Sequence, residues 1–133
     1  MESRLRAKAE RARRVLVVDD NDDMLESTKV LLERAGYDVE VASNGERAVI
    51  LQRKRPADVL ITDLFMPDKD GVELISHFRR EFPAVPIIAM SGGGARTKRD
   101  YLADTSLLGV DATLRKPFEP EALRQTLQRL LFA

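Results

Sequence analysis

The sequence predicts an α/β protein in which helices cover both faces of a parallel β-sheet. Three observations lead to this fold class. Short apolar runs alternate five times with segments of helical length, which is the pattern that β-α units produce. The runs are continuously apolar, as in Val15–Val18 and Val59–Ile61, which is typical of strands buried on both faces. The 133 residues also suffice for one compact domain with its own core.

The apolar runs are the expected strands, of which the second is the least apolar. In chain order they lie at 15–18, 38–42, 59–61, 86–90 and 111–115. Right-handed crossovers between parallel strands place all of their carboxyl ends at one edge of the sheet. In such folds this edge holds the ligand.

Five helices are expected after the strands, most of them with apolar residues at a spacing near 3.6. Asp22 or Asp23 is expected to cap the first helix, Gly36 to end it and Pro56 to break the second. The fourth segment is polar and has the weakest helical pattern. The helices are expected from Asp22 or Asp23 to Ala35, over 44–54, around 74–82, over 96–108 and around 123–131.

Composition excludes several classes of site. The chain has no cysteine and one histidine, so disulfides, thiolate zinc sites, cysteine nucleophiles, multi-histidine metal sites and Ser-His-Asp hydrolysis are excluded. The histidine, His77, lies within a helical segment and is expected to be exposed. No apolar run approaches the ~18 residues of a membrane span, so we expect a cytoplasmic protein without membrane insertion.

The formal net charge of zero, from 22 Lys+Arg and 22 Asp+Glu, conceals an uneven distribution. Residues 1–14 contain six basic and two acidic residues, so the remainder carries a net charge of −4. We therefore expect a basic N-terminal extension over 1–14 and one acidic domain over 15–132. The extension is interpreted as a disordered, solubilising end, with a partner-binding helix as the alternative. Direct nucleic-acid binding is not expected, because the domain is acidic and contains no recognisable DNA-binding module.

Polar residues follow four of the expected strands. Asp19 and Asp20 follow the first, Asp63 the third, Ser91 the fourth and Lys116 the fifth. Because parallel strands end at the same edge, three carboxylates, a hydroxyl and an ammonium are expected to meet there. The alternative, that such acids only cap helices, is kept for Asp22 and Asp23 but is disfavoured for this group.

The expected cluster favours phosphoryl chemistry. Two carboxylates ~4 Å apart repel by about 4 kcal/mol at an effective dielectric constant of 20, and Lys116 compensates only one of three charges. Oxygen ligands in this number suit Mg²⁺. A carboxylate beside a cation and a lysine can attack phosphorus to give an aspartyl phosphate.

Four motifs resemble the receiver domain of bacterial two-component response regulators. They read VLVVDDN over 15–21, VLITDLFMPDKDG over 59–71, IAMSG over 88–92 and LRKPF over 114–118. Each motif is weak alone, but their order and spacing together are highly specific, and the resemblance covers 15–132. It implies a flavodoxin-like (βα)5 fold, a doubly wound three-layer sandwich with strand order 2-1-3-4-5.

The resemblance also implies how the phosphoryl group is handled. Asp63 is expected to accept it from a histidine kinase or a histidine phosphotransfer protein. Ser91 and Lys116 are expected to bind its oxygens. The bond between Lys116 and Pro117 is expected to be cis, as a tight turn before proline permits.

A metal site is implied by the same resemblance. Asp20 is expected to be the main ligand of Mg²⁺ (or Mn²⁺), with Asp19 supporting it, often through water. Asp63 would supply a further oxygen, and the backbone carbonyl of Phe65 another.

Three positions depart from the family pattern. Thr113 stands where the family usually has an aromatic residue that rotates on activation, so the output is expected not to depend on such a ring. Phe65 and Gly93 border the expected path of the hydrolytic water, and neither offers a side chain that orients water. Autodephosphorylation is therefore expected to be slow.

The function expected is that of a single-domain, stand-alone response regulator that signals to an unidentified downstream protein by protein–protein interaction. It is not expected to be an enzyme beyond its own phosphotransfer and slow autodephosphorylation. Homodimerisation through the fourth helix, fifth strand and fifth helix is left open, as is a longer parent protein. The alternative is a phospho-independent interaction module with the same fold. A haloacid-dehalogenase-like phosphatase is disfavoured, because Phe65 replaces its second aspartate.

Overall fold

The computed structural model describes residues 12–64, 71–91 and 109–132. Five parallel strands form one sheet in the order β2-β1-β3-β4-β5. The strands are β1 (Arg14–Val18), β2 (Asp38–Ala42), β3 (Val59–Asp63), β4 (Ile87–Ser91) and β5 (Ala112–Arg115). The helices are α2 (Asp22–Arg34), α3 (Gly45–Lys54), α4 (Gly71–Glu81) and α6 (Pro120–Phe132). Within these ranges, no helix is long and apolar enough to cross a membrane.

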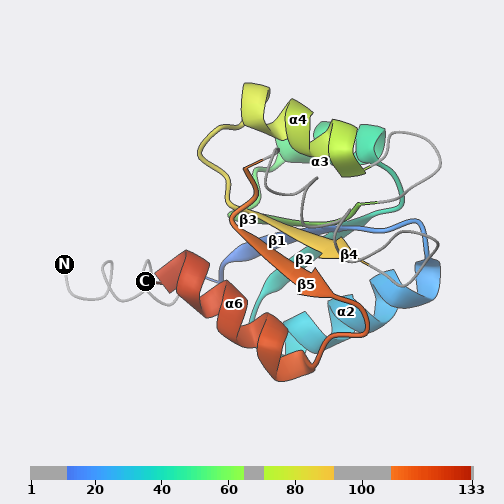
Figure 1. Ribbon diagram of the computed structural model, residues 1–133, viewed down its shortest axis with the longest axis vertical. Helices are drawn as coiled ribbons and strands as arrows, with labels where there is room; N and C mark the ends of the chain where they lie inside the picture. The colour runs from blue at the N-terminus through green and yellow to red at the C-terminus, as the bar shows by residue number, and fades with distance from the viewer. Residues whose placement is uncertain (1–11, 65–70, 92–108, 133) are drawn as a thin grey trace.

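The sheet separates two apolar cores (Figure 1). Helices α3 and α4 cover one face, where Leu60 and Phe78 are fully buried. Helices α2 and α6 cover the other face, where Ile61 and Leu123 are fully buried. Leu60 and Ile61 are neighbours that point into opposite cores, as alternate residues of a strand do. The predicted fold class, flavodoxin-like with strand order 2-1-3-4-5, is confirmed.

Strands extend beyond the apolar runs where polar residues keep the pairing of the sheet. β3 continues through Thr62, which pairs with β1, and Asp63, which pairs with β4. β4 likewise ends at Ser91 rather than one residue earlier. The expected polar helix over 96–108 lies outside the described residues. The bond between Lys116 and the following proline is cis, as predicted.

The cap of α2 differs from the expectation. Asn21 is the N-cap residue, in an extended conformation, and its side-chain oxygen accepts a hydrogen bond from the backbone N–H of Met24 at 3.0 Å. The prediction of Asp22 or Asp23 as the cap is therefore wrong. Both acids lie in the first helical turn, where their charges interact favourably with the positive end of the helix dipole.

Arg14 belongs to the sheet, although it ends the basic segment 1–14. Its side chain is 11% exposed, and its guanidinium pairs with Asp38 at 2.8 Å and with Glu40 at 3.0 Å, both on β2. Its backbone N–H donates to the Asp58 carboxylate at 2.7 Å. These bonds tie the start of β1 to its neighbours, whereas residues 1–11 lie outside the described part.

Helices α3 and α4 are joined at their carboxyl ends by ionic contacts. Arg53 binds Glu81 through two hydrogen bonds of 2.6 and 2.7 Å, and His77 approaches the same carboxylate at 2.8 Å. A hydrogen bond from Arg53, and to a smaller extent one from His77, lowers the pKa of Glu81 to about 2. The His77 side chain is 18% exposed and stacks on Phe82, so the expectation of an exposed residue is wrong.

Candidate functional site

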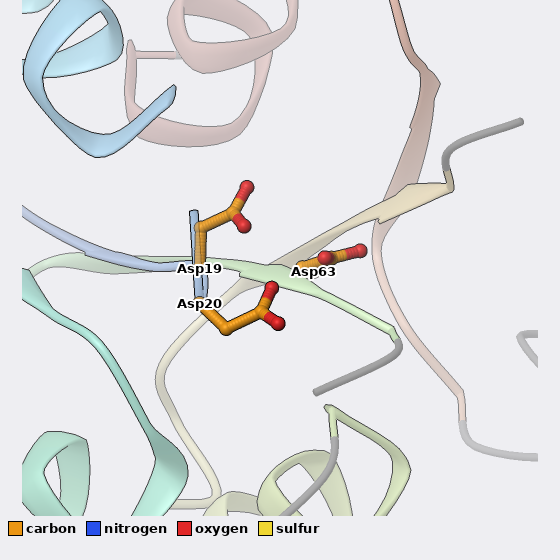
Figure 2. A group of neighbouring side chains, drawn as sticks. All are labelled: Asp19, Asp20 and Asp63. Carbon is orange, nitrogen blue, oxygen red and sulfur yellow. The ribbon is translucent and has the colours of Figure 1, made fainter. Parts of the chain in front are cut away.

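Three carboxylates meet at the carboxyl edge of the sheet, as the sequence predicts. Asp19 and Asp20 follow β1, and Asp63 ends β3. Figure 2 shows the three side chains grouped beside the ends of these strands. One oxygen of each lies within 4.8 Å of the others. At that separation each pair of charges repels by about 3 kcal/mol at an effective dielectric constant of 20.

Sheet register brings the other predicted residues to the same edge. Asp63 pairs with Met90, the residue before Ser91, and Ser91 pairs with Arg115, the residue before Lys116. The backbone N–H of Lys116 donates to the Ser91 carbonyl at 2.7 Å. Ser91 is half-buried at the end of β4. The polar residues predicted at four strand ends therefore share one edge.

Asp19 is buried with both of its carboxylate oxygens bound. Its side chain is 1% exposed; Oδ1 accepts from the backbone N–H of Asn21 at 3.0 Å and Oδ2 from the Lys116 ammonium at 2.6 Å. A buried carboxylate is tolerated only when it is paired in this way. Asn21 therefore serves both α2, as its cap, and the site, a role that the sequence reasoning missed.

Lys116 lies between two carboxylates. Its ammonium is 3.4 Å from Asp63 Oδ2, a longer separation than its 2.6 Å contact with Asp19. The Lys116 side chain is 16% exposed and the Asp63 side chain 11%. The same cation thus partly neutralises both buried acids.

Asp20 differs from the other two acids because its side chain is exposed. No side chain in the described ranges pairs with its carboxylate. Three carboxylates and one ammonium leave a net charge of −2 at the edge. An accessible carboxylate, two further oxygen donors and this excess charge fit a hard divalent cation such as Mg²⁺.

Two residues beside Asp63 were not singled out from the sequence. The hydroxyl of Thr62, which is fully buried, donates to the Asp63 carbonyl at 2.9 Å. Gly71, the first residue of α4, packs so closely that a Cβ there would lie 1.9 Å from the Asp63 carbonyl oxygen. A polar residue inside an apolar strand was the available signal for Thr62.

Several expectations concern positions beside this edge. Thr113 is exposed on β5 and pairs with Ala89. Phe65 and Gly93 lie outside the described residues, as does the basic extension over 1–11. The carbonyl ligand expected from Phe65 and the water path expected near Gly93 therefore remain predictions.

An apolar groove opens between α2 and the turn that follows Lys116. Met24, Ser27, Leu31 and Phe118 are among the residues that line it. α2 begins just after Asp19 and Asp20, and Phe118 lies two residues after Lys116. Residues that line the groove therefore lie close along the chain to Asp20 and Lys116.

Comparison with known families gives one match over most of the chain. The model of the response regulator receiver domain matches residues 15–128. This range contains all of the predicted site residues.

Curated relatives include transcriptional regulators. The chain is 31% identical over 122 residues to the alkaline phosphatase synthesis transcriptional regulatory protein PhoP of Bacillus subtilis, covering 90% of this chain and 48% of that protein. It is 36% identical over 121 residues to the transcriptional regulatory protein TrcR of Mycobacterium tuberculosis, covering 89% and 45%. The chain thus spans about half the length of the curated relatives it matches.

Among solved structures, the match extends over all or nearly all of two similar proteins. The chemotaxis protein CheY4 of Vibrio cholerae superimposes with a TM-score of 0.82 at 32% identity, covering 91% of this chain and 100% of that one. A response regulator receiver protein of Pseudomonas putida gives a TM-score of 0.80 at 32% identity, covering 90% and 98%.

Proposed function

The chain belongs to the response regulator receiver domain family, and we propose that it accepts a phosphoryl group on Asp63 from a phosphohistidine protein in a Mg²⁺-dependent reaction. One observation carries the proposal: Asp63 shares the ammonium of Lys116 with Asp19, and the exposed Asp20 lies beside them. This arrangement gives a nucleophilic carboxylate compensated by a cation, with an exposed acidic ligand beside it.

Asp63 acts as the nucleophile. A carboxylate oxygen forms a bond to phosphorus while the bond between phosphorus and the donor histidine nitrogen breaks. The imidazole leaves with the electron pair and takes a proton from solvent. The product is an aspartyl phosphate with balanced charge and atoms.

The other members of the cluster bind charge that develops on phosphorus. Lys116 pairs with one phosphoryl oxygen, for which it shifts away from Asp19, and the hydroxyl of Ser91 donates to another. Asp20, Asp19 and Asp63, with the carbonyl of Phe65, would hold Mg²⁺. When bound, the ion would neutralise negative charge of the carboxylates and of the phosphoryl group.

The protein acts on its own side chain and turns over no separate substrate. Hydrolysis of the aspartyl phosphate is slow, because neither Phe65 nor Gly93 supplies a group that positions water. The signal is the phosphorylated state itself, which a downstream protein reads through a changed surface. Thr113 is exposed and not aromatic, so this change does not require a ring at that position.

The groove between α2 and the Lys116 turn is where the phosphohistidine protein docks in this proposal. An apolar groove lined in part by the turn after Lys116 would let a partner bury a helix face while its histidine reaches Asp63. A histidine kinase or a histidine phosphotransfer protein that presents its histidine on a helix would satisfy this geometry.

Phosphotransfer profiling tests the proposal. The chain and an Asp63→Asn variant are incubated with each phosphorylated histidine kinase and phosphotransfer protein of the host, with Mg²⁺ or with a chelator. Transfer to the wild type by one donor, only with Mg²⁺ and not to the variant, supports the proposal. A wild type that accepts no phosphate and binds neither Mg²⁺ nor beryllofluoride would instead indicate a phospho-independent interaction module.

A further inference from the structure

We propose that Thr62 and Gly71 are positioning residues that fix the direction of the Asp63 carboxylate by holding the peptide group that follows it. The inference rests on the proposed function, because it concerns the orientation of the proposed phosphoacceptor. It assigns a purpose to a buried hydroxyl and to a close helix contact that the cluster of charges does not explain.

Thr62 places a hydroxyl inside an otherwise apolar strand. The residue is completely buried, with an exposed fraction of 0%. A buried hydroxyl without an acceptor would be destabilising by about 1–3 kcal/mol. Here the hydroxyl donates to the carbonyl of Asp63 at 2.9 Å, at the point where β3 leaves the sheet.

The same peptide group is held at its other end. The backbone N–H of Leu64 donates to the Met90 carbonyl on β4 at 3.1 Å. The carbonyl of Asp63 and the N–H of Leu64 belong to one rigid plane, so two bonds to opposite ends fix its rotation. That rotation is the ψ angle of Asp63, which sets how the backbone presents the carboxylate to Lys116.

Gly71 closes this arrangement from the side of α4. A Cβ at Gly71 would lie 1.9 Å from the Asp63 carbonyl oxygen and 2.6 Å from Leu64 Cα. The N–H of Gly71 donates to the Leu64 carbonyl at 3.1 Å. The start of α4 therefore rests on the main chain of Asp63 and Leu64, and only glycine permits this approach.

The orientation of the Asp63 carboxylate matters because the rate of the reaction depends on how precisely the reacting groups are placed. Lys116 is 3.4 Å from Asp63, and an error of ~1 Å in the position of a reacting group can lower a rate by up to ~100-fold. Loss of the Thr62 hydroxyl frees one end of the peptide plane. We expect a rate decrease smaller than that limit, about tenfold.

Thr62→Val and Thr62→Ser test the inference, because valine keeps the shape of threonine and serine keeps its hydroxyl. The readout is the labelling rate of Asp63 by phosphoramidate at saturating Mg²⁺, below the melting temperature of every variant. Thr62→Val is expected to be labelled about tenfold more slowly than the wild type, and Thr62→Ser at nearly the wild-type rate. Thr126→Val, at a half-buried threonine of α6 whose hydroxyl donates to the Ala122 carbonyl at 2.8 Å, is the matched control and is expected to keep the wild-type rate.

The Leu64 and Gly71 amides give a second readout that needs no phosphorylation. Their hydrogen exchange, followed by NMR, is expected to be faster in Thr62→Val than in Thr62→Ser or Thr126→Val. Wild-type labelling and exchange in Thr62→Val would overturn the inference while leaving the proposed function intact. A wild type that is never labelled would contradict the proposed function, and amide exchange would then still decide whether Thr62 holds this peptide group.

Discussion

Lys116 binds Asp19 more closely than Asp63, with its ammonium 2.6 Å from the first carboxylate and 3.4 Å from the second. Asp19 is 1% exposed, so its buried carboxylate needs the ammonium of Lys116 as a compensating partner. The lysine proposed to pair with the phosphoryl group therefore also stabilises the fold before phosphorylation. Its two tasks compete, because the ammonium cannot lie closest to Asp19 and to a phosphoryl oxygen on Asp63 at the same time.

Lys116→Met is expected to separate stability from labelling. Removing one partner of a buried ion pair typically destabilises a protein by about 3–5 kcal/mol, so the variant should melt well below the wild type in a chelator. Because the edge then carries a net charge of −3 rather than −2, added Mg²⁺ should raise the melting temperature of the variant more than that of the wild type. Labelling of Asp63 should nevertheless be slower.

Lys54→Met is the control for this prediction, since Lys54 is exposed at the end of α3. Melting curves with Mg²⁺ and with a chelator measure both variants. An equal rise in melting temperature with Mg²⁺ for Lys116→Met and Lys54→Met would show that the charge of Lys116 does not weaken cation binding at this edge.

Ser27→Arg is expected to separate protein donors from small donors. Ser27 is exposed on α2 and lines the groove, so a long side chain there blocks the groove without entering the core. Transfer from a phosphohistidine protein should fall about tenfold or more, whereas labelling by phosphoramidate should be unchanged. Gln128→Arg, exposed on α6, should affect neither; unimpaired protein transfer to Ser27→Arg would place the donor elsewhere.

The contact between α3 and α4 should depend on pH. Hydrogen bonds from Arg53 and His77 hold the pKa of Glu81 at about 2, below its ordinary value of 4.5. A carboxyl group with a lowered pKa contributes stability that is complete above about pH 4.5 and is lost as the pH falls toward 2. Because Glu81 is on the surface, Glu81→Gln should lower the melting temperature only slightly at neutral pH, and this difference should shrink in that acidic range.

Glu33→Gln is the matched control, at an exposed position of α2 where no described side chain binds the carboxylate. Its melting temperature should follow that of the wild type more closely at neutral pH. A Glu81→Gln difference that stays constant from neutral pH to pH 3 would show that the Arg53 contact contributes nothing that titrates.

Phe65→Asn is expected to shorten the lifetime of the phosphorylated state. A carboxamide two residues after Asp63 could position water, which a phenyl ring cannot, and a positioned polar group should accelerate hydrolysis by about tenfold or more. The loss of phosphate after removal of the donor measures the rate. Phe65→Leu should keep the long lifetime, and an equally long lifetime in Phe65→Asn would remove Phe65 from the explanation.

Much of the fold could be predicted because five short apolar runs alternate with helical segments and polar residues follow four of them. The runs predicted the number of strands, and the parallel arrangement then placed Asp19, Asp63 and Lys116 at one edge. The strand limits were less predictable. Thr62 and Asp63 are polar, yet they continue β3 because β1 and β4 pair with them.

The positioning parts of the site could not be predicted, since they depend on tertiary contacts. Asn21 caps α2 although two acids follow it, because Asn21 has the extended conformation of a cap and the helix already begins at Asp22. Arg14 seemed part of a solvated tail until the register placed Asp38 opposite it. Gly71 is one glycine in a loop motif, and its packing on Asp63 appears only when α4 lies against β3.

The most direct test of the central claim is the site of modification. The chain is treated with phosphoramidate and Mg²⁺, and the intact mass and the labelled peptide are determined by mass spectrometry beside Asp63→Asn and a sample with chelator. The account predicts one added phosphoryl group, located on Asp63 and absent from both controls. A phosphoryl group that persists in Asp63→Asn, or a wild type that gains none, would contradict it.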